Sequence, residues 1–136
     1  QVVPSRSSLA HAEAVAIAVA QQSLRTHDLS APGLPAMELV TSAQPCIQCY
    51  GILWWSGLRR VVIGANHEDV ESLTGFHEGP LPQEWAEKLE HRPPLPPIEV
   101  IQDVRRAEAR RVLRIYRETG GTVYNPGAQA PGRQQA

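Results

Sequence analysis

A histidine, a glutamate and two cysteines stand at spacings that suit metal-dependent chemistry. His11 and Glu13 are two residues apart, and Cys46 and Cys49 are three apart. One imidazole and two thiolates are three zinc ligands, and a zinc ion with three protein ligands keeps a fourth position for water or substrate. Glu13 lies beside the first ligand and remains free to move protons. The pattern therefore predicts a catalytic zinc site rather than a structural one.

Each half of this pattern is ambiguous by itself. His-x-Glu occurs in many alanine-rich helices without any metal, and Cys-x-x-Cys is also the pattern of a redox dithiol. The combination favours zinc, because Pro45 precedes Cys46, an apolar strand is expected just before it, and both cysteines of the chain lie in the motif. A redox pair, or a pair without metal, stays open as the alternative.

Two predicted helices bring these residues together. Residues 10–24 are rich in alanine and carry apolar side chains at helical spacing, which predicts a helix that packs on a sheet. Side chains two apart face nearly opposite sides of a regular helix, so His11 and Glu13 can share a pocket only at its first turn. The cysteines begin a second helix, over about 46–57, whose N-terminal dipole favours thiolates.

The second helix is flanked by predicted strands over 38–42 and 60–65. Strand, helix and strand in this order predict a parallel pair with a right-handed crossover, and ligands then belong at the carboxyl ends of the strands. The other expected elements are an extended segment over 1–10, an irregular substrate loop over 66–80, a helix over 82–89, an edge strand over 98–101 and a last helix, capped by Asp103, that ends near 119.

Length and charge narrow the function classes. The 136 residues suit one domain, over 1–125, followed by a flexible tail over 126–136 that is rich in Pro, Gly, Gln and Ala. A net charge of −1 favours neither nucleic acid nor membrane as a partner, and no apolar run is long enough to cross a bilayer. The arginines of the last helix spread around it, as on a solvated surface. Two thiols that serve a metal predict a cytoplasmic protein.

The His-x-Glu and Pro-Cys-x-x-Cys pattern resembles the signature of the cytidine deaminase superfamily of zinc deaminases. Within that superfamily, residues 2–80 look like the bacterial guanine deaminases. The runs that carry this resemblance are Val3-Pro4, His11-Ala12-Glu13, Thr26-His27-Asp28-Leu29-Ser30, Glu38-Leu39-Val40-Thr41-Ser42, Pro45-Cys46-Ile47-Gln48-Cys49, Trp55-Ser56-Gly57 and Gly75-Phe76-His77-Glu78.

The resemblance implies a fold and an assembly. We expect the cytidine deaminase-like three-layer α/β/α sandwich with a mixed sheet. Compared with its relatives, the chain would lack the N-terminal helix and the first two strands, and would keep about three of the usual five strands. Relatives in this branch form homodimers, which makes a homodimer the expected assembly.

The resemblance also implies a reaction, the hydrolytic deamination of guanine to xanthine and ammonia. It assigns Zn²⁺ as the cofactor, held by His11, Cys46 and Cys49, with Glu13 as the proton shuttle. Glu78 takes the place of the residue that reads the base and helps protonate the leaving group. A carboxylate suits that place, because its two oxygens can accept hydrogen bonds from the adjacent N1–H and amine of guanine.

Other assignments are less specific. Substrate contacts are expected from Ala12, Trp55 and Tyr124. Of the two neighbouring tryptophans, Trp54 and Trp55, only one can face the pocket, and Trp55 is the one assigned to it. Tyr124 could cover the pocket or contact a partner. The chain departs from the family at Gln44, commonly Glu, and at His77, commonly Asp, and either change could alter substrate preference. The alternatives are a deaminase of another amino-heterocycle (tRNA adenosine, cytosine or an aminotriazine) and a non-catalytic zinc-binding remnant.

Overall fold

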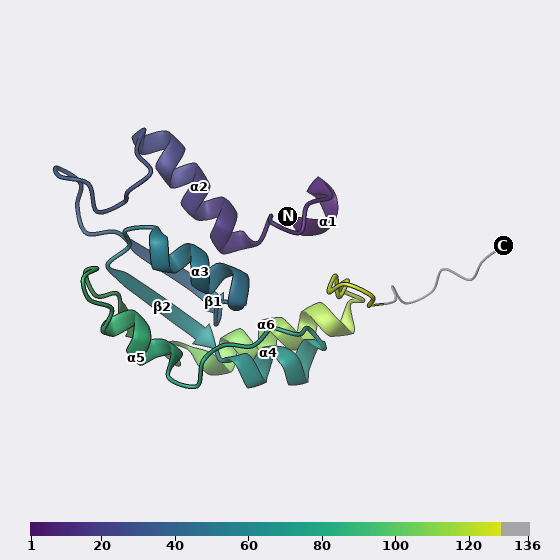
Figure 1. Cartoon of the computed structure of the whole chain (residues 1–136). Helices are drawn as coiled ribbons and strands as arrows, with labels where there is room; N and C mark the ends of the chain where they lie inside the picture. Colours follow the sequence, from purple (N-terminus) through teal and green to yellow (C-terminus); the bar gives the residue numbers. More distant parts are fainter. Residues whose placement is uncertain (129–136) are drawn as a thin grey trace.

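Three parallel strands form the sheet that positions the site. They are β1 (Glu38–Ala43), β2 (Arg60–Ala65) and β3 (Glu99–Ile101). In the computed structural model, which describes residues 1–128, they pair in the order β1-β2-β3. Figure 1 labels β1 and β2 of this sheet. We expected a mixed sheet, but both pairings of the described strands are parallel. The reason is that at least one helix separates each strand from the next, and such crossover connections give parallel pairs.

Helices cover both faces of this sheet. The helices of the described residues are α1 (Val2–Ser5), α2 (Ala12–Leu24), α3 (Ile47–Trp55), α4 (His67–Thr74), α5 (Trp85–Glu90) and α6 (Arg106–Glu118). On one face, Val61 of β2 is buried in a cluster with side chains of α2, α3 and α5. On the other face, a Cβ placed on Gly64 of β2 would lie 2.9 Å from the Cβ of Ala109, so α6 packs closely on the sheet there. The three-layer arrangement expected from the resemblance is confirmed.

The segment after β2 differs from its prediction. Residues 66–80 were expected to be irregular, but α4 occupies the first half of that range. The side chain of Asn66 accepts a hydrogen bond from the backbone of Asp69, and the Asp69 carboxylate accepts one from the backbone N–H of Asn66. This reciprocal capping pair starts the helix. The helix ends at Gly75, whose φ of 84° is left-handed. The loop that reaches the site is therefore shorter than expected.

The two ends of the chain also correct predictions. The predicted extended segment over 1–10 contains the short helix α1. Asp103 was expected to cap the last helix, but α6 begins at Arg106 with Arg105 at its N-cap. Both Asp103 and Arg105 have positive φ, of 61° and 51°, so the chain turns twice through left-handed conformations before the helix starts.

Some predictions concern residues at or beyond the end of the described range. Most of the predicted flexible tail, 126–136, lies outside the described residues, so the division into domain and tail stays a prediction. Within residues 1–128, no helix combines the length and the apolar character that crossing a bilayer requires.

Candidate metal centre and active site

The N-terminal end of α2 brings the predicted ligand His11 and the predicted proton shuttle Glu13 into one pocket. His11 is the N-cap residue, in an extended conformation with φ −63° and ψ 153°, and Glu13 lies in the first turn. Because the backbone is not yet helical at His11, the two side chains reach the same space although they are two residues apart. Both line a pocket of about 990 Å³, which we call the site pocket. This is the placement at the first turn that their spacing permits.

The N-terminal end of α3 supplies the two sulfurs. Cys46 is the N-cap residue and Cys49 lies in the first turn, and neither is in a disulfide. Nδ1 of His11 is 3.4 Å from Sγ of Cys46 and 3.6 Å from Sγ of Cys49. Bonds of about 2.3 Å to sulfur and about 2.0 Å to nitrogen at a tetrahedral angle would separate the two atoms by about 3.5 Å. The three side chains therefore fit a zinc ion with a free fourth position.

The two thiols differ in their affinity for protons. A hydrogen bond from Cys49 lowers the pKa of Cys46 to about 5. The same hydrogen bond, together with burial and the nearby charge of Glu13, raises the pKa of Cys49. In the absence of a cation the pair thus retains one proton between two sulfurs. A divalent cation stabilises both thiolates, so metal binding releases that proton.

Glu13 lies beside the ligands without belonging to the ligand set. Its Oε2 is 3.5 Å from Sγ of Cys49, and its Oε1 is 3.5 Å from the hydroxyl of Thr41, which donates to it. The cluster whose atoms could hold a metal consists of His11, Cys46 and Cys49. The carboxylate is therefore placed to exchange protons with a molecule that occupies the fourth position of the metal.

The loop after α4 brings a second carboxyl group to the site pocket. Glu78 lines this pocket. Burial, and then the negative charges of Cys46 and Glu13, raise the pKa of Glu78 to about 7. A partly buried carboxyl with a raised pKa in a pocket is typical of functional sites.

Two aromatic side chains, Phe76 and Tyr124, line the site pocket, and we call this pair the aromatic cover. The ring of Tyr124 packs edge to face on Phe76, with 4.6 Å between centroids, and lies 6.0 Å from the ring of His11. Ala12 lines the same pocket. The structure therefore brings together all the predicted site residues except Trp55.

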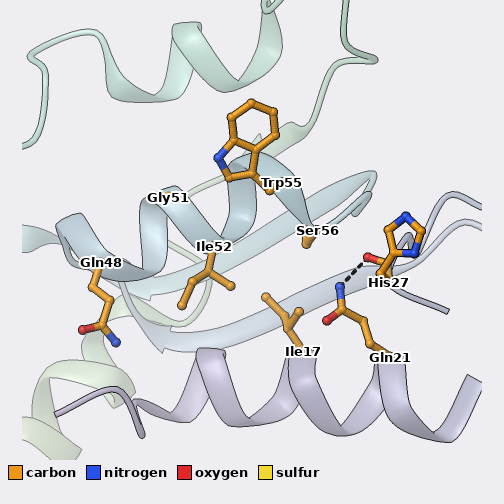
Figure 2. Close-up of a pocket in the computed structure, with 8 residues that line it drawn as sticks. All are labelled: Ile17, Gln21, His27, Gln48, Gly51, Ile52, Trp55 and Ser56. Atoms are coloured by element: carbon orange, nitrogen blue, oxygen red, sulfur yellow. Dashed lines mark hydrogen bonds between the residues drawn. The ribbon is translucent and has the colours of Figure 1, made fainter. Parts of the chain in front are cut away.

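Trp55 lies away from the site pocket, which corrects its predicted contact with substrate. It is the last residue of α3, six residues after Cys49, which corresponds to about 9 Å along the helix axis. Its side chain is 75% exposed and lines another pocket, of about 470 Å³, between α2 and α3. Figure 2 shows the residues that line this pocket, among them Ile17 and Gln21 of α2, and none of the labelled residues is a predicted zinc ligand.

The two departures from the family pattern lie in different surroundings. The side chain of His77 is 89% exposed. Gln44 is buried, and its side-chain oxygen accepts a hydrogen bond of 3.0 Å from the backbone N–H of His67 at the start of α4. Both residues line the site pocket, Gln44 as a buried residue and His77 as an exposed one.

Two residues at the site were not predicted from the sequence. Thr41 could have been noticed, because it is a polar residue on the strand face that packs toward α3, between Leu39 and Ala43. Asn125 gave no signal, since its contacts lie 48 residues away in the chain, at His77.

Known proteins support this interpretation of the site. Residues 1–65 match the family model of the cytidine and deoxycytidylate deaminase zinc-binding region. A probable cytosine deaminase of Schizosaccharomyces pombe is 33% identical over 72 residues, which are 53% of this chain and 40% of that protein.

Solved structures are similar over most of the chain. The guanine deaminase from Nitrosomonas europaea is 50% identical with a TM-score of 0.80, over 86% of this chain and 62% of that one. A complex of NE0047 with 2,6-diaminopurine is 50% identical with a TM-score of 0.82, over 91% of this chain and 63% of that one. The chain thus spans less than two thirds of the length of these relatives. In its fold, its metal cluster and its sequence, the chain is therefore similar to zinc deaminases of the cytidine deaminase type.

Proposed function

We propose that this chain carries the catalytic site of a zinc-dependent enzyme that hydrolyses guanine to xanthine and ammonia. The observation that carries the proposal is the position of Glu78, which lines the same pocket as His11, Cys46 and Glu13. Guanine presents two adjacent donors, N1–H and the C2 amine, and a carboxylate accepts from both. The similarity to the guanine deaminase from Nitrosomonas europaea supports the same substrate.

The residues around the metal divide the chemistry among them. A zinc ion held by His11, Cys46 and Cys49 would supply Lewis-acid activation of water at neutral pH. Glu13 accepts a proton from the attacking water and donates it to a ring nitrogen beside C2 as the new C–O bond forms. Glu13 then accepts the proton of the new C2 hydroxyl and transfers it to the amine, as the C2 carbonyl forms and the C2–N bond breaks. One water is consumed and one ammonia leaves, so the carboxylate is regenerated.

Glu78 orients the base in this scheme. Its carboxylate holds the N1–H and amine edge so that C2 faces the activated water, and it stands near enough to the amine to assist its protonation. The rings of Tyr124 and Phe76 exclude bulk water from that edge.

Cytosine is the second candidate substrate, because the matching Schizosaccharomyces pombe protein is described as a probable cytosine deaminase. Its pairing edge combines one amine donor with the N3 acceptor. An ionised Glu78 would then set one oxygen against the lone pair of N3, which is unfavourable. The carboxylate therefore favours guanine over cytosine.

A substrate panel tests the proposal. Zinc-loaded protein is incubated with guanine, cytosine, an adenosine-bearing tRNA and an aminotriazine, and ammonia release is measured with the Glu13→Gln variant as the blank. We expect ammonia and stoichiometric xanthine from guanine. If ammonia is released from another compound and not from guanine, that compound is the substrate instead. If none of them releases ammonia while zinc is bound, the chain is a non-catalytic zinc-binding protein.

The setting of this activity is also part of the proposal. We infer a homodimer that acts in purine metabolism in the cytoplasm. The assignment of both cysteines to a metal site supports a reducing compartment. Sedimentation equilibrium would test the dimer, and a single species of monomer mass at micromolar concentration would contradict it.

A further inference from the structure

The side-chain amide of Asn125 pairs with the backbone of His77. The backbone N–H of His77 donates to Oδ1 of Asn125 at 2.6 Å, and Nδ2 of Asn125 donates to the carbonyl oxygen of His77 at 3.1 Å. Two parallel bonds from one planar group fix the orientation of the loop backbone as well as its distance. The C-terminal segment is in this way joined to the residue that precedes Glu78.

Two other elements hold the backbone of Glu78 itself. Its N–H donates to Oε1 of Glu71, on α4, at 3.1 Å. Its carbonyl oxygen accepts from the N–H of Ile47, the first residue of α3, at 2.9 Å. The next residue, Gly79, has φ of 84° and no room for a Cβ against Ile47. The Glu78 main chain is thus fixed on both sides, and Asn125, which also lines the site pocket, holds the residue before it.

Asn125 also fixes the position of the aromatic cover, through its neighbour Tyr124. Tyr124 precedes Asn125 in the chain, and its ring packs on Phe76, which precedes His77. The amide bonds therefore hold two neighbouring pairs in register, Tyr124 on Phe76 and Asn125 on His77. A shift of either segment would move the aromatic cover and the Glu78 carboxyl together.

We propose that Asn125 is a positioning residue, which holds the 76–79 loop so that the Glu78 carboxyl faces the purine edge under Tyr124. This inference rests on the proposed function, because it assigns Glu78 to the substrate. A positioning role differs from a purely structural role in one measurable respect. Loss of Asn125 should weaken purine binding while zinc content and chain folding stay unchanged.

Hydrogen exchange tests the contact without any turnover. In zinc-loaded protein, the Asn125→Ala variant is compared with wild type and with Gln102→Ala, an exposed position that lines neither pocket. We expect the amide of His77 to exchange at least about tenfold faster in Asn125→Ala, with amides of β2 unchanged. Unchanged exchange at His77 would overturn the inference.

Kinetics and binding test the consequence. We expect the KM for guanine to rise about tenfold in Asn125→Ala, with kcat within about threefold of wild type, since one positioned hydrogen-bonding group is lost. An unchanged KM would overturn the inference, as would equal losses of kcat and zinc.

Failure of the proposed function is recognised separately, as absence of guanine turnover in wild type. Calorimetric affinity for 8-azaguanine then decides: a loss of about tenfold in the variant supports the inference. Equal affinities, or no binding by wild type, would overturn it.

Discussion

The Nδ1 atom of His11 lies 3.4 Å from the Sγ atom of Cys46, across 35 residues of sequence. Each of the two residues is the N-cap of a helix, α2 for His11 and α3 for Cys46. A side chain at an N-cap points off the end of its helix, so the cluster forms only where the ends of α2 and α3 meet. Metal binding and the packing of these helices are therefore linked.

Replacement of Cys46 by serine should abolish zinc binding. A serine hydroxyl is a weaker ligand than a thiolate, and two remaining ligands hold zinc poorly. We expect the zinc content after gel filtration, measured by plasma mass spectrometry, to fall at least about tenfold. The matched control is Gln48→Ala, between the two cysteines, whose amide contacts the carbonyl oxygen of Leu9 and not the cluster. Full zinc content in Cys46→Ser would contradict the assigned ligand set.

Replacement of Glu13 by glutamine should separate metal binding from catalysis. The amide is nearly isosteric and leaves the three ligands intact, but it cannot accept the proton of the attacking water. We expect kcat for guanine to fall by at least about 100-fold at wild-type zinc content. Retained turnover would assign the proton transfers to another group.

The parts of the fold that local patterns determine were predictable. The strand over 60–65 coincides with β2, and the helix over 10–24 corresponds to α2 with its start moved by two residues. Both are runs of mostly apolar residues, long and rich in alanine for the helix, short and rich in β-branched residues for the strand. α4 was missed because its sequence is mostly polar and its start depends on the capping pair of Asn66 and Asp69.

The site residues also divide into those that local sequence patterns predict and those that depend on the folded chain. The metal ligands lie in short motifs, so residue type and spacing were sufficient to predict them. Trp55 was misplaced because the side of α3 on which a residue lies does not fix the pocket it reaches; its position along the helix axis matters as well. Asn125 required the folded chain, because nothing near it in sequence indicates its contact with His77.

Replacement of Glu78 by glutamine should damage binding of guanine more than the chemical step. The amide keeps one acceptor and presents a donor where guanine also presents a donor. We expect KM for guanine to rise by about 10-fold to 100-fold, the effect of losing a hydrogen bond to a charged group. Glu71→Gln, which alters the support of the Glu78 backbone but keeps its carboxyl, should have a smaller effect. An unchanged KM in Glu78→Gln would show that Glu78 does not contact the substrate.

The pH dependence should report the same carboxyl. Burial raises the pKa of Glu78 to about 7, so the group is protonated below that pH and then accepts with fewer oxygens. We therefore expect affinity for 8-azaguanine to fall as the pH drops from 8 to 6. The fall should approach, and not exceed, about tenfold per pH unit once the pH is well below the pKa. The Glu78→Gln variant should lack this step. The same step in both proteins would assign the titration to another group.

Asp69 makes the charged contact that joins α4 to α6. Its carboxylate is 2% exposed and accepts from Nε of Arg106 at 2.7 Å and from a guanidinium nitrogen of Arg110. The hydrogen bond from Arg106 lowers the pKa of Asp69 below its usual value. Since α6 covers the sheet behind the site, this contact supports the fold rather than the chemistry.

Replacement of Asp69 by asparagine should therefore destabilise the protein without removing zinc. The buried carboxylate between two guanidinium groups is lost, but both arginines are partly exposed and water screens them, so the loss of unfolding free energy should be smaller than for a fully buried ion pair. Urea denaturation measures the loss, with Glu108→Gln, in an exposed pair with Arg105, as the control that should leave stability nearly unchanged. Because the folded pKa of Asp69 is lowered, its contribution is present above the unfolded pKa of about 4 and is lost as pH falls through the folded pKa. The difference between wild type and variant should shrink in acid, and a difference independent of pH would show that the carboxylate charge is not what stabilises this contact.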